Sequence, residues 1–227
     1  MNAKFIALGL SLASLYCHSA SAGVVVGGTR VVYDGTKKES SIQINNPDKT
    51  AYLIQSWVEN SQGIADKSAF FVTPPLFRLD GNQNNTLRIM LATPALAKNK
   101  ESLYWLNIKS IPAVEQNTAG NSLQLAVKTR IKLIYRPAEL KGQVPEQLAD
   151  KLTWQRIGNR LTVTNPTPYY MNFYAINVGG KAVQDVTWVA PGATATFALS
   201  PAHSGSQVSW QIISDYGASG ATHQAAL

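Results

Sequence analysis

The chain has 227 residues, 45% of them hydrophobic, and a formal net charge of +7 at neutral pH. That length accommodates one large or two ordinary domains with enough residues to bury real hydrophobic cores. One cysteine and three histidines rule out a disulfide framework and leave few ligands for a metal site.

Residues 1–22 have the pattern of a secretory signal peptide. A lone positive charge at Lys4 precedes an apolar run, and the small residues Ala20-Ser21-Ala22 suit a cleavage site. The run is too short for a stable anchor, and no later stretch approaches the roughly 20 apolar residues of a membrane span. We therefore expect an exported mature chain that starts at Gly23 and lacks the single cysteine, Cys17. Outside the cytoplasm, a basic protein favours acidic partners, carboxylates or membrane surfaces over nucleic acid.

The first half of the mature chain reads almost entirely as β-strand. Strands are predicted at 24–33, 41–45, 52–58, 69–72, 86–91, 103–108 and 121–137. Turn residues such as Asp80-Gly81-Asn82 separate them. Seven short strands without a long helix predict a β-sandwich of immunoglobulin size.

The last of these segments contains a long, regular alternation. One parity carries the apolar residues Leu123, Leu125, Val127, Ile131 and Leu133. The other parity carries the basic residues Lys128, Arg130 and Lys132. A period of two is typical of a strand with one apolar and one basic face. The apolar face fills either the domain's own core, which is the commoner case, or a groove in another protein.

After Arg136-Pro137 the pattern changes. Residues 138–149 contain Lys141-Gly142 and Pro145, and they predict a connector with one helical turn. Further strands are predicted at 152–156, 160–164, 169–178, 186–189, 194–199 and 208–214. We therefore divide the chain into a signal peptide at 1–22, an N-terminal immunoglobulin-like domain at 23–143 and a C-terminal β-sandwich domain at 144–227.

The sequence contains no recognisable catalytic or cofactor-binding motif. Phosphate-binding loops, G-x-S-x-G and H-E-x-x-H patterns are absent. The histidines His203 and His223 are expected in loops, and Asp80, Glu101 and Asp215 form no evident acid–base pair. We expect a binding protein rather than an enzyme, with no metal and no cofactor.

Six short blocks spread over the mature chain identify a family. They are T-R-V-V-Y-D-G at 29–35, T-P-P-L-F-R-L at 73–79, E-S-L-Y-W-L-N at 101–107, I-K-L-I-Y-R-P at 131–137, N-P-T-P-Y-Y at 165–170 and D-Y-G at 215–217. In this order they resemble the periplasmic chaperones that assemble pili by the chaperone/usher route. The resemblance implies an all-β, L-shaped protein of the periplasm, with two immunoglobulin-like domains and a binding cleft between them.

The resemblance also implies roles for particular residues. Arg30 and Lys132 match two basic cleft residues that hold the C-terminal carboxylate of a pilus subunit. The donor strand, which fills the groove of a subunit lacking its own final strand, is matched by Leu123, Leu125, Val127 and, as a lesser contributor, Ile131. Under this interpretation, which is called donor-strand complementation, the apolar face packs largely into the core of a partner subunit.

Three further features follow from the same resemblance. Glu101, Arg136 and Asp215 match an ionic network that links the two domains. Thr73-Pro74 matches a position where the family has a cis peptide, although the sequence leaves the isomer open. The short connection at 113–120 matches the short-loop branch of the family, which builds rod-like adhesive pili.

The implied partners are pilus subunits and an outer-membrane usher. When the protein is free, self-association into a homo-oligomer would cover the exposed apolar face.

Two other interpretations stay open. An exported pilus subunit or adhesin would end in an alternating strand, whereas residues 217–227 are rich in glycine and alanine. A glycan-binding or carbohydrate-processing protein would need exposed aromatic residues, whereas the five tryptophans lie mostly within strand patterns, where core packing is expected.

Overall fold

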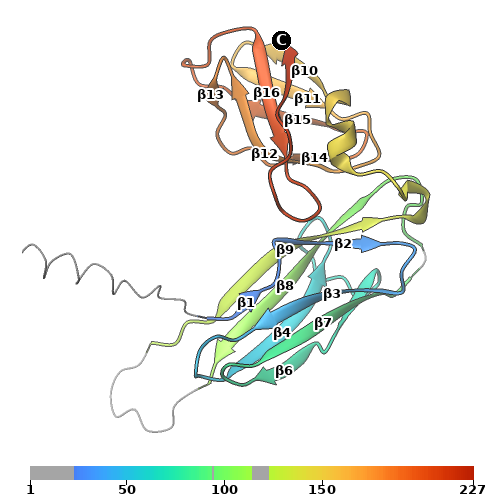
Figure 1. Cartoon of the computed structure of the whole chain (residues 1–227), viewed down its shortest axis with the longest axis vertical. Coiled ribbons are helices and arrows are strands. Elements are labelled where there is room, and N and C mark those ends of the chain that lie inside the picture. The colour runs from blue at the N-terminus through green and yellow to red at the C-terminus, as the bar shows by residue number, and fades with distance from the viewer. Residues whose placement is uncertain (1–22, 94, 114–122) are drawn as a thin grey trace, which may run out of the picture.

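The computed structural model describes residues 23–93, 95–113 and 123–227. The predicted signal peptide with Cys17 lies outside the described residues, and so does most of the predicted short loop at 113–120. Within the described part of the chain, no helix is long and apolar enough to cross a membrane. Figure 1 shows two β domains, which confirms the predicted all-β class with two immunoglobulin-like sandwiches in an L-shape.

The N-terminal domain is a sandwich of two sheets. The first sheet has the order β1-β3-β7-β5, with bounds Val25–Val26, Glu39–Asn45, Asn84–Leu91 and Phe70–Thr73. The second has the order β2-β9-β8-β4-β6, with bounds Arg30–Asp34, Val127–Arg136, Ser102–Pro112, Tyr52–Glu59 and Leu76–Leu79. Alternating apolar side chains from both sheets, including fully buried Ile44, Leu87 and Leu133, form one core.

The strand predicted at 24–33 is two strands in different sheets. β1 pairs with β3, whereas β2 crosses to the other sheet and pairs in parallel with β9. The crossing occurs at Gly27 and Gly28, where the backbone passes close to β3: a Cβ on Gly27 would lie 3.0 Å from the carbonyl oxygen of Gln43. The prediction was wrong because valines continue on both sides of the crossing, so the alternation does not mark it.

The C-terminal domain is a second, smaller sandwich. One sheet has the order β10-β11-β15, with bounds Thr153–Ile157, Arg160–Thr164 and Thr194–Ala198. The other has the order β13-β12-β16-β17, with bounds Lys181–Ala182, Met171–Val178, Gln207–Ile212 and His223–Ala226, and β14 at Trp188–Val189 also pairs with β12. In its core, the ring of Trp154 contacts those of Phe173 and Trp210.

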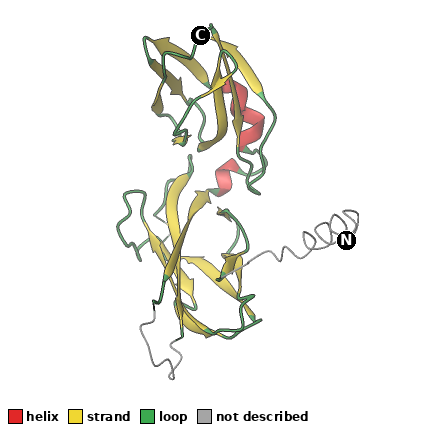
Figure 2. Cartoon of the chain, turned by 90° about the vertical axis from the view of Figure 1, so that its left-hand side faces the viewer, coloured by secondary structure: helices red, strands yellow, loops and turns green. Residues whose placement is uncertain are grey.

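Two short 3-10 helices, η2 at Ala138–Leu140 and η3 at Pro145–Lys151, connect the domains; both are red in Figure 2. Leu148 and Ala149 of η3 are buried in the core of the C-terminal domain. The domain boundary that we predict at residue 143 falls between these helices and stays a prediction.

Three strands of the structure were not predicted: β6, β13 and β17. His223, expected in a loop, lies on β17 opposite Trp210, and the two rings stack at 5.7 Å. His203 does lie in a turn, yet it is buried there. The strand β17 escapes a pattern-based prediction because its sequence, H-Q-A-A, has no apolar alternation, and backbone pairing with β16 holds it in place.

Candidate functional site

The alternating apolar residues of the segment that leads into β9 fall into two groups, one exposed and one buried. Leu123, Leu125 and Val127 are 84%, 69% and 56% exposed, whereas Ile131 and Leu133 are 7% and 0% exposed. One alternation therefore faces solvent at its N-terminal end and the domain's own core at its C-terminal end. We call Leu123, Leu125 and Val127 the exposed apolar face.

This division corrects two predictions. The strand begins at Val127 rather than at residue 121, since described residues 123–126 are not part of a strand. Pairing with β8 ends at Ser110 opposite Val127, and β2 reaches only as far as Lys132. The prediction that Ile131 enters a partner's groove is also wrong, because its side chain belongs to the buried core of the N-terminal domain.

The basic pair, Arg30 and Lys132, lies at one level of the second sheet. The two residues are direct register partners on β2 and β9. Among the described residues neither forms an ion pair, and Arg30 Nε is buried without a hydrogen-bond partner. Burial, together with the Arg30 charge, lowers the pKa of Lys132 from 10.5 to about 8. Two adjacent, partly desolvated cations that form no ion pair favour an anion, although the carboxylates of Asp215 and Glu146 act on Arg30 from a distance.

Two further basic residues of β9, Lys128 and Arg130, share one carboxylate. Lys128 Nζ lies 3.1 Å and Arg130 Nη2 3.3 Å from the carboxylate of Glu59, which is only 7% exposed. The indole N–H of Trp57 donates to the same carboxylate at 3.0 Å. Of these four cations, only Arg30 and Lys132, on the side of the C-terminal domain, have no ion-pair partner among the described residues.

Three cations of β9 also lie over tryptophan rings. Lys128 lies over Trp57 at 5.0 Å, and Arg130 lies over Trp105 at 4.2 Å. Lys132 lies 4.3 Å from the ring centre of Trp188, which comes from the C-terminal domain. Core packing was expected for the tryptophans as a group; these three are instead only partly buried, and a cation lies over each ring. Such contacts stabilise a cation most when water is partly excluded.

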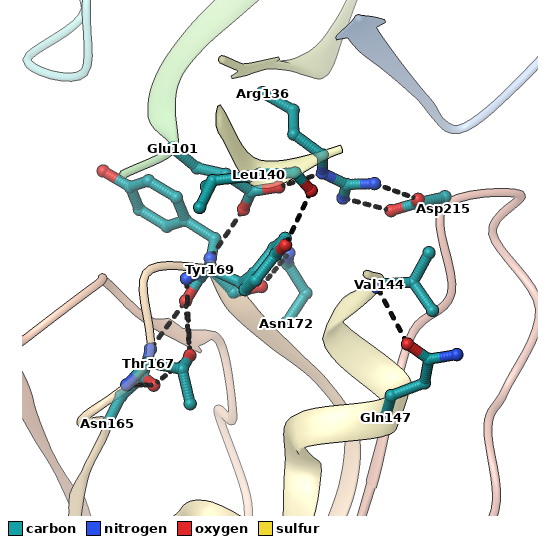
Figure 3. Close-up of polar contacts among 11 residues, drawn as sticks. Glu101, Arg136, Leu140, Val144, Gln147, Asn165, Thr167, Tyr169, Asn172 and Asp215 are labelled. Carbon is teal, nitrogen blue, oxygen red and sulfur yellow. Dashed lines mark hydrogen bonds and ion pairs between the residues drawn. The ribbon is translucent and has the colours of Figure 1, made fainter. Parts of the chain in front are cut away.

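Glu101, Arg136 and Asp215 are brought together between the domains, as Figure 3 shows. Arg136 donates from Nε to Glu101 at 2.7 Å and from Nη1 and Nη2 to the two Asp215 oxygens at 2.6 and 2.8 Å. The other oxygen of Glu101 accepts the backbone N–H of Tyr170 at 2.7 Å. Burial raises the pKa of Glu101 to about 7, although the Arg136 charge and the Tyr170 N–H act against the rise. The triad thus joins both domains through a forked, largely buried arginine contact.

Two further sequence blocks gain a structural explanation. Gly217 has a φ of +88°, and a Cβ there would lie 2.5 Å from the hydroxyl of Thr29, so only glycine fits where this loop meets β2. The Thr73-Pro74 peptide bond, whose isomer the sequence left open, is cis.

Two residues that touch Lys132 were not predicted from the sequence. Its ammonium donates to the side-chain oxygen of Asn172 at 2.5 Å and lies over the ring of Trp188. Both residues belong to the C-terminal domain, 40 or more positions along the chain. No pattern within either segment could have indicated this contact, because only the packing of the two domains creates it.

Comparisons with known proteins give the same picture for both domains. Residues 23–141 match the family described as "Pili and flagellar-assembly chaperone, PapD N-terminal domain". Residues 147–224 match the family described as "Pili assembly chaperone PapD, C-terminal domain". These are chaperone families, which are a non-enzymatic class.

Individual relatives agree over nearly the whole chain. The chaperone protein FimC of Escherichia coli K12 is 43% identical over 210 residues, covering 91% of this chain and 86% of the relative. The probable fimbrial chaperone LpfB of Escherichia coli O157:H7 is 43% identical over 220 residues, covering 96% and 94%.

Among solved structures, the Escherichia coli chaperone DraB is 37% identical with a TM-score of 0.81, covering 90% of this chain and 96% of that one. A Salmonella enterica structure of the SafA pilin in complex with the SafB chaperone is 34% identical with a TM-score of 0.85, covering 92% and 99%. Together with the two domain matches, these likenesses show that the chain belongs to the family of pilus assembly chaperones.

Proposed function

We propose that this protein is a periplasmic chaperone that binds pilus subunits by donor-strand complementation and delivers them to an outer-membrane usher. The observation that carries the proposal is the exposed apolar face, Leu123, Leu125 and Val127, on the strand that leads to the unneutralised Lys132. A relative solved as a complex with a pilin supports the choice of partner. Because both domains match chaperone families, the alternatives of a subunit, an adhesin or a glycan-binding protein lose their support.

The exposed apolar face has the chemistry of a lent strand. A subunit that lacks its final strand exposes both a groove of core side chains and an unpaired sheet edge, which is an aggregation hazard. Each inserted leucine or valine contributes roughly 1.5–3 kcal/mol when fully buried. Each new backbone hydrogen bond adds roughly 1 kcal/mol net, and ordering and association costs reduce the total. Residues 123–126 are not part of a strand in the free chain, so their backbone can pair with a partner.

The basic pair complements this face by setting the register. A subunit's C-terminal carboxylate placed between Arg30 and Lys132 would align its last strand with residues 123–127. A slip by one residue would direct Gln124 instead of Leu125 into the apolar groove. The charges therefore choose the alignment, while the apolar side chains supply most of the affinity.

Several finer elements complete the proposal. Residues 1–22 direct export to the periplasm, and the ion triad of Glu101, Arg136 and Asp215 holds the angle between the domains. Such buried ion pairs often contribute more to geometry than to net stability. In the free protein, self-association would cover the exposed apolar face.

A charge reversal at the anchor tests the proposal. In Lys132→Glu, subunits should no longer copurify with the tagged protein from its native periplasm, because loss of one member of a desolvated charge pair costs roughly 2–5 kcal/mol. Lys181→Glu is a matched control, since Lys181 is exposed on β13 of the C-terminal domain. Normal subunit recovery with a folded Lys132→Glu protein would overturn the assignment of the anchor.

A further inference from the structure

The Lys132 side chain is held by groups from both domains. From the N-terminal domain, Arg30 and Trp105 are its register partners on the two neighbouring strands. From the C-terminal domain, Asn172 accepts its hydrogen bond and Trp188 lies beneath it. Asn172 and Trp188 are themselves register partners on β12 and β14, so they present one continuous patch.

This patch is tied to the junction between the domains. Asn172 is 3% exposed, and its backbone carbonyl accepts the N–H of Ile213 at 2.7 Å. Tyr170, two residues earlier on the same chain segment, donates its backbone N–H to Glu101 of the ion triad. The ring of Trp188 meets that of Trp105 edge-on at 5.8 Å. The position of the patch relative to Lys132 therefore depends on how the domains pack.

The chemistry of the patch differs from that around the neighbouring cations. An amide oxygen and an aromatic face attract an ammonium but carry no net charge. Lys128 and Arg130, in contrast, form ion pairs with Glu59. Lys132 is thus oriented by neutral groups, and its charge stays available for an incoming anion.

We propose that Asn172 and Trp188 are positioning residues that hold the Lys132 ammonium beside Arg30, so that the carboxylate anchor is assembled from both domains. The inference rests on the proposed function, since it concerns how the anchor is presented to a subunit's C-terminal carboxylate. It assigns to the C-terminal domain a direct share in anion recognition, beyond its contribution to the shape of the molecule.

The test compares two forms of one synthetic peptide of alternating valine and threonine, ending in a free carboxylate or in an amide. In Asn172→Asp, the new carboxylate neutralises Lys132, so the affinity for the free-acid peptide should fall by about tenfold or more. Affinity for the amide should be unchanged. NMR titration of the lysine side chains should show the pKa of Lys132 rising from its wild-type value of about 8, because an adjacent carboxylate favours the charged form. Asn177→Asp, the same substitution elsewhere on β12, should leave the affinity for both peptides unchanged.

Trp188 provides a second test that does not depend on the first variant folding. Trp188→Leu keeps an apolar side chain but loses the aromatic face, and it should weaken binding of the free acid by about two- to fivefold. Trp188→Phe should restore part of that loss. Equal effects on the acid and amide peptides would overturn the inference and leave only a structural role. If the wild-type protein itself does not distinguish acid from amide, the carboxylate anchor of the proposed function fails instead.

Discussion

The two ends of the segment around β9 share one alternation but have opposite surroundings. At the N-terminal end, Leu123, Leu125 and Val127 are exposed, and described residues 123–126 are outside any strand. At the C-terminal end, Leu133 is fully buried, and Arg136 is fixed by carboxylates of both domains. The strand is anchored at one end and available at the other.

The difference teaches that the same pattern of side chains serves two cores. Where β2, β8 and the facing sheet surround β9, its apolar residues complete the home domain. Beyond the reach of β2 and β8, the next residues of the same parity have no such cover. In the proposed function, a bound pilus subunit covers these residues. The rigid end then holds the free end in a defined direction, which lowers the ordering cost of binding.

The largest expected effect comes from truncating the buried end. Leu133→Ala should lower the free energy of unfolding by roughly 2–5 kcal/mol, because it leaves a cavity in a well-packed core. Leu125→Ala makes the same chemical change at the exposed end and should stay within about 0.5 kcal/mol of the wild type. Urea unfolding of both variants measures the contrast. Similar losses at the two positions would refute the division of the strand.

The second effect concerns the buried charges at the anchored end. The pKa of Glu101 in the folded protein, about 7, lies above its ordinary value of 4.5. The folded protein therefore favours the protonated form of Glu101. This contribution to the stability of the fold is complete below pH 4.5 and is lost as the pH rises through about 7. This loss has a slope of up to about 1.4 kcal/mol per pH unit.

Glu101→Gln removes this titration and should flatten that part of the pH dependence. Urea unfolding of both proteins between about pH 5 and 8 measures it. The two proteins differ only at position 101, so the difference between the curves isolates Glu101. Parallel curves would contradict a raised pKa at this position.

The smallest effect on the stability of the free protein is expected at the exposed N-terminal end of this segment. Replacing Leu123, Leu125 and Val127 together with serine should change the free energy of unfolding by less than about 1 kcal/mol, because these side chains are exposed. The comparison needs low protein concentration, since self-association would stabilise the wild type. Subunit copurification should nevertheless be lost. A drop of several kcal/mol would mean that these residues pack against their own domain.

The sequence alone determined the all-β class, the two domains and the parity of apolar and basic residues on β9. Local alternation and turn residues are enough for this, because they depend on neighbours along the chain. The functional residues came from the family resemblance of six blocks, not from any pattern of chemistry. Among them, Arg30 and Lys132 are now seen as register partners.

Tertiary structure alone decided what covers each face. It placed Ile131 in the home core, split the first strand at Gly27 and Gly28, and brought Asn172 and Trp188 of the other domain to Lys132. The physical reason is that a period of two tells which side chains share a face but not what lies against it. That cover comes from segments far away in the sequence, and for the exposed apolar face the proposed cover is another protein.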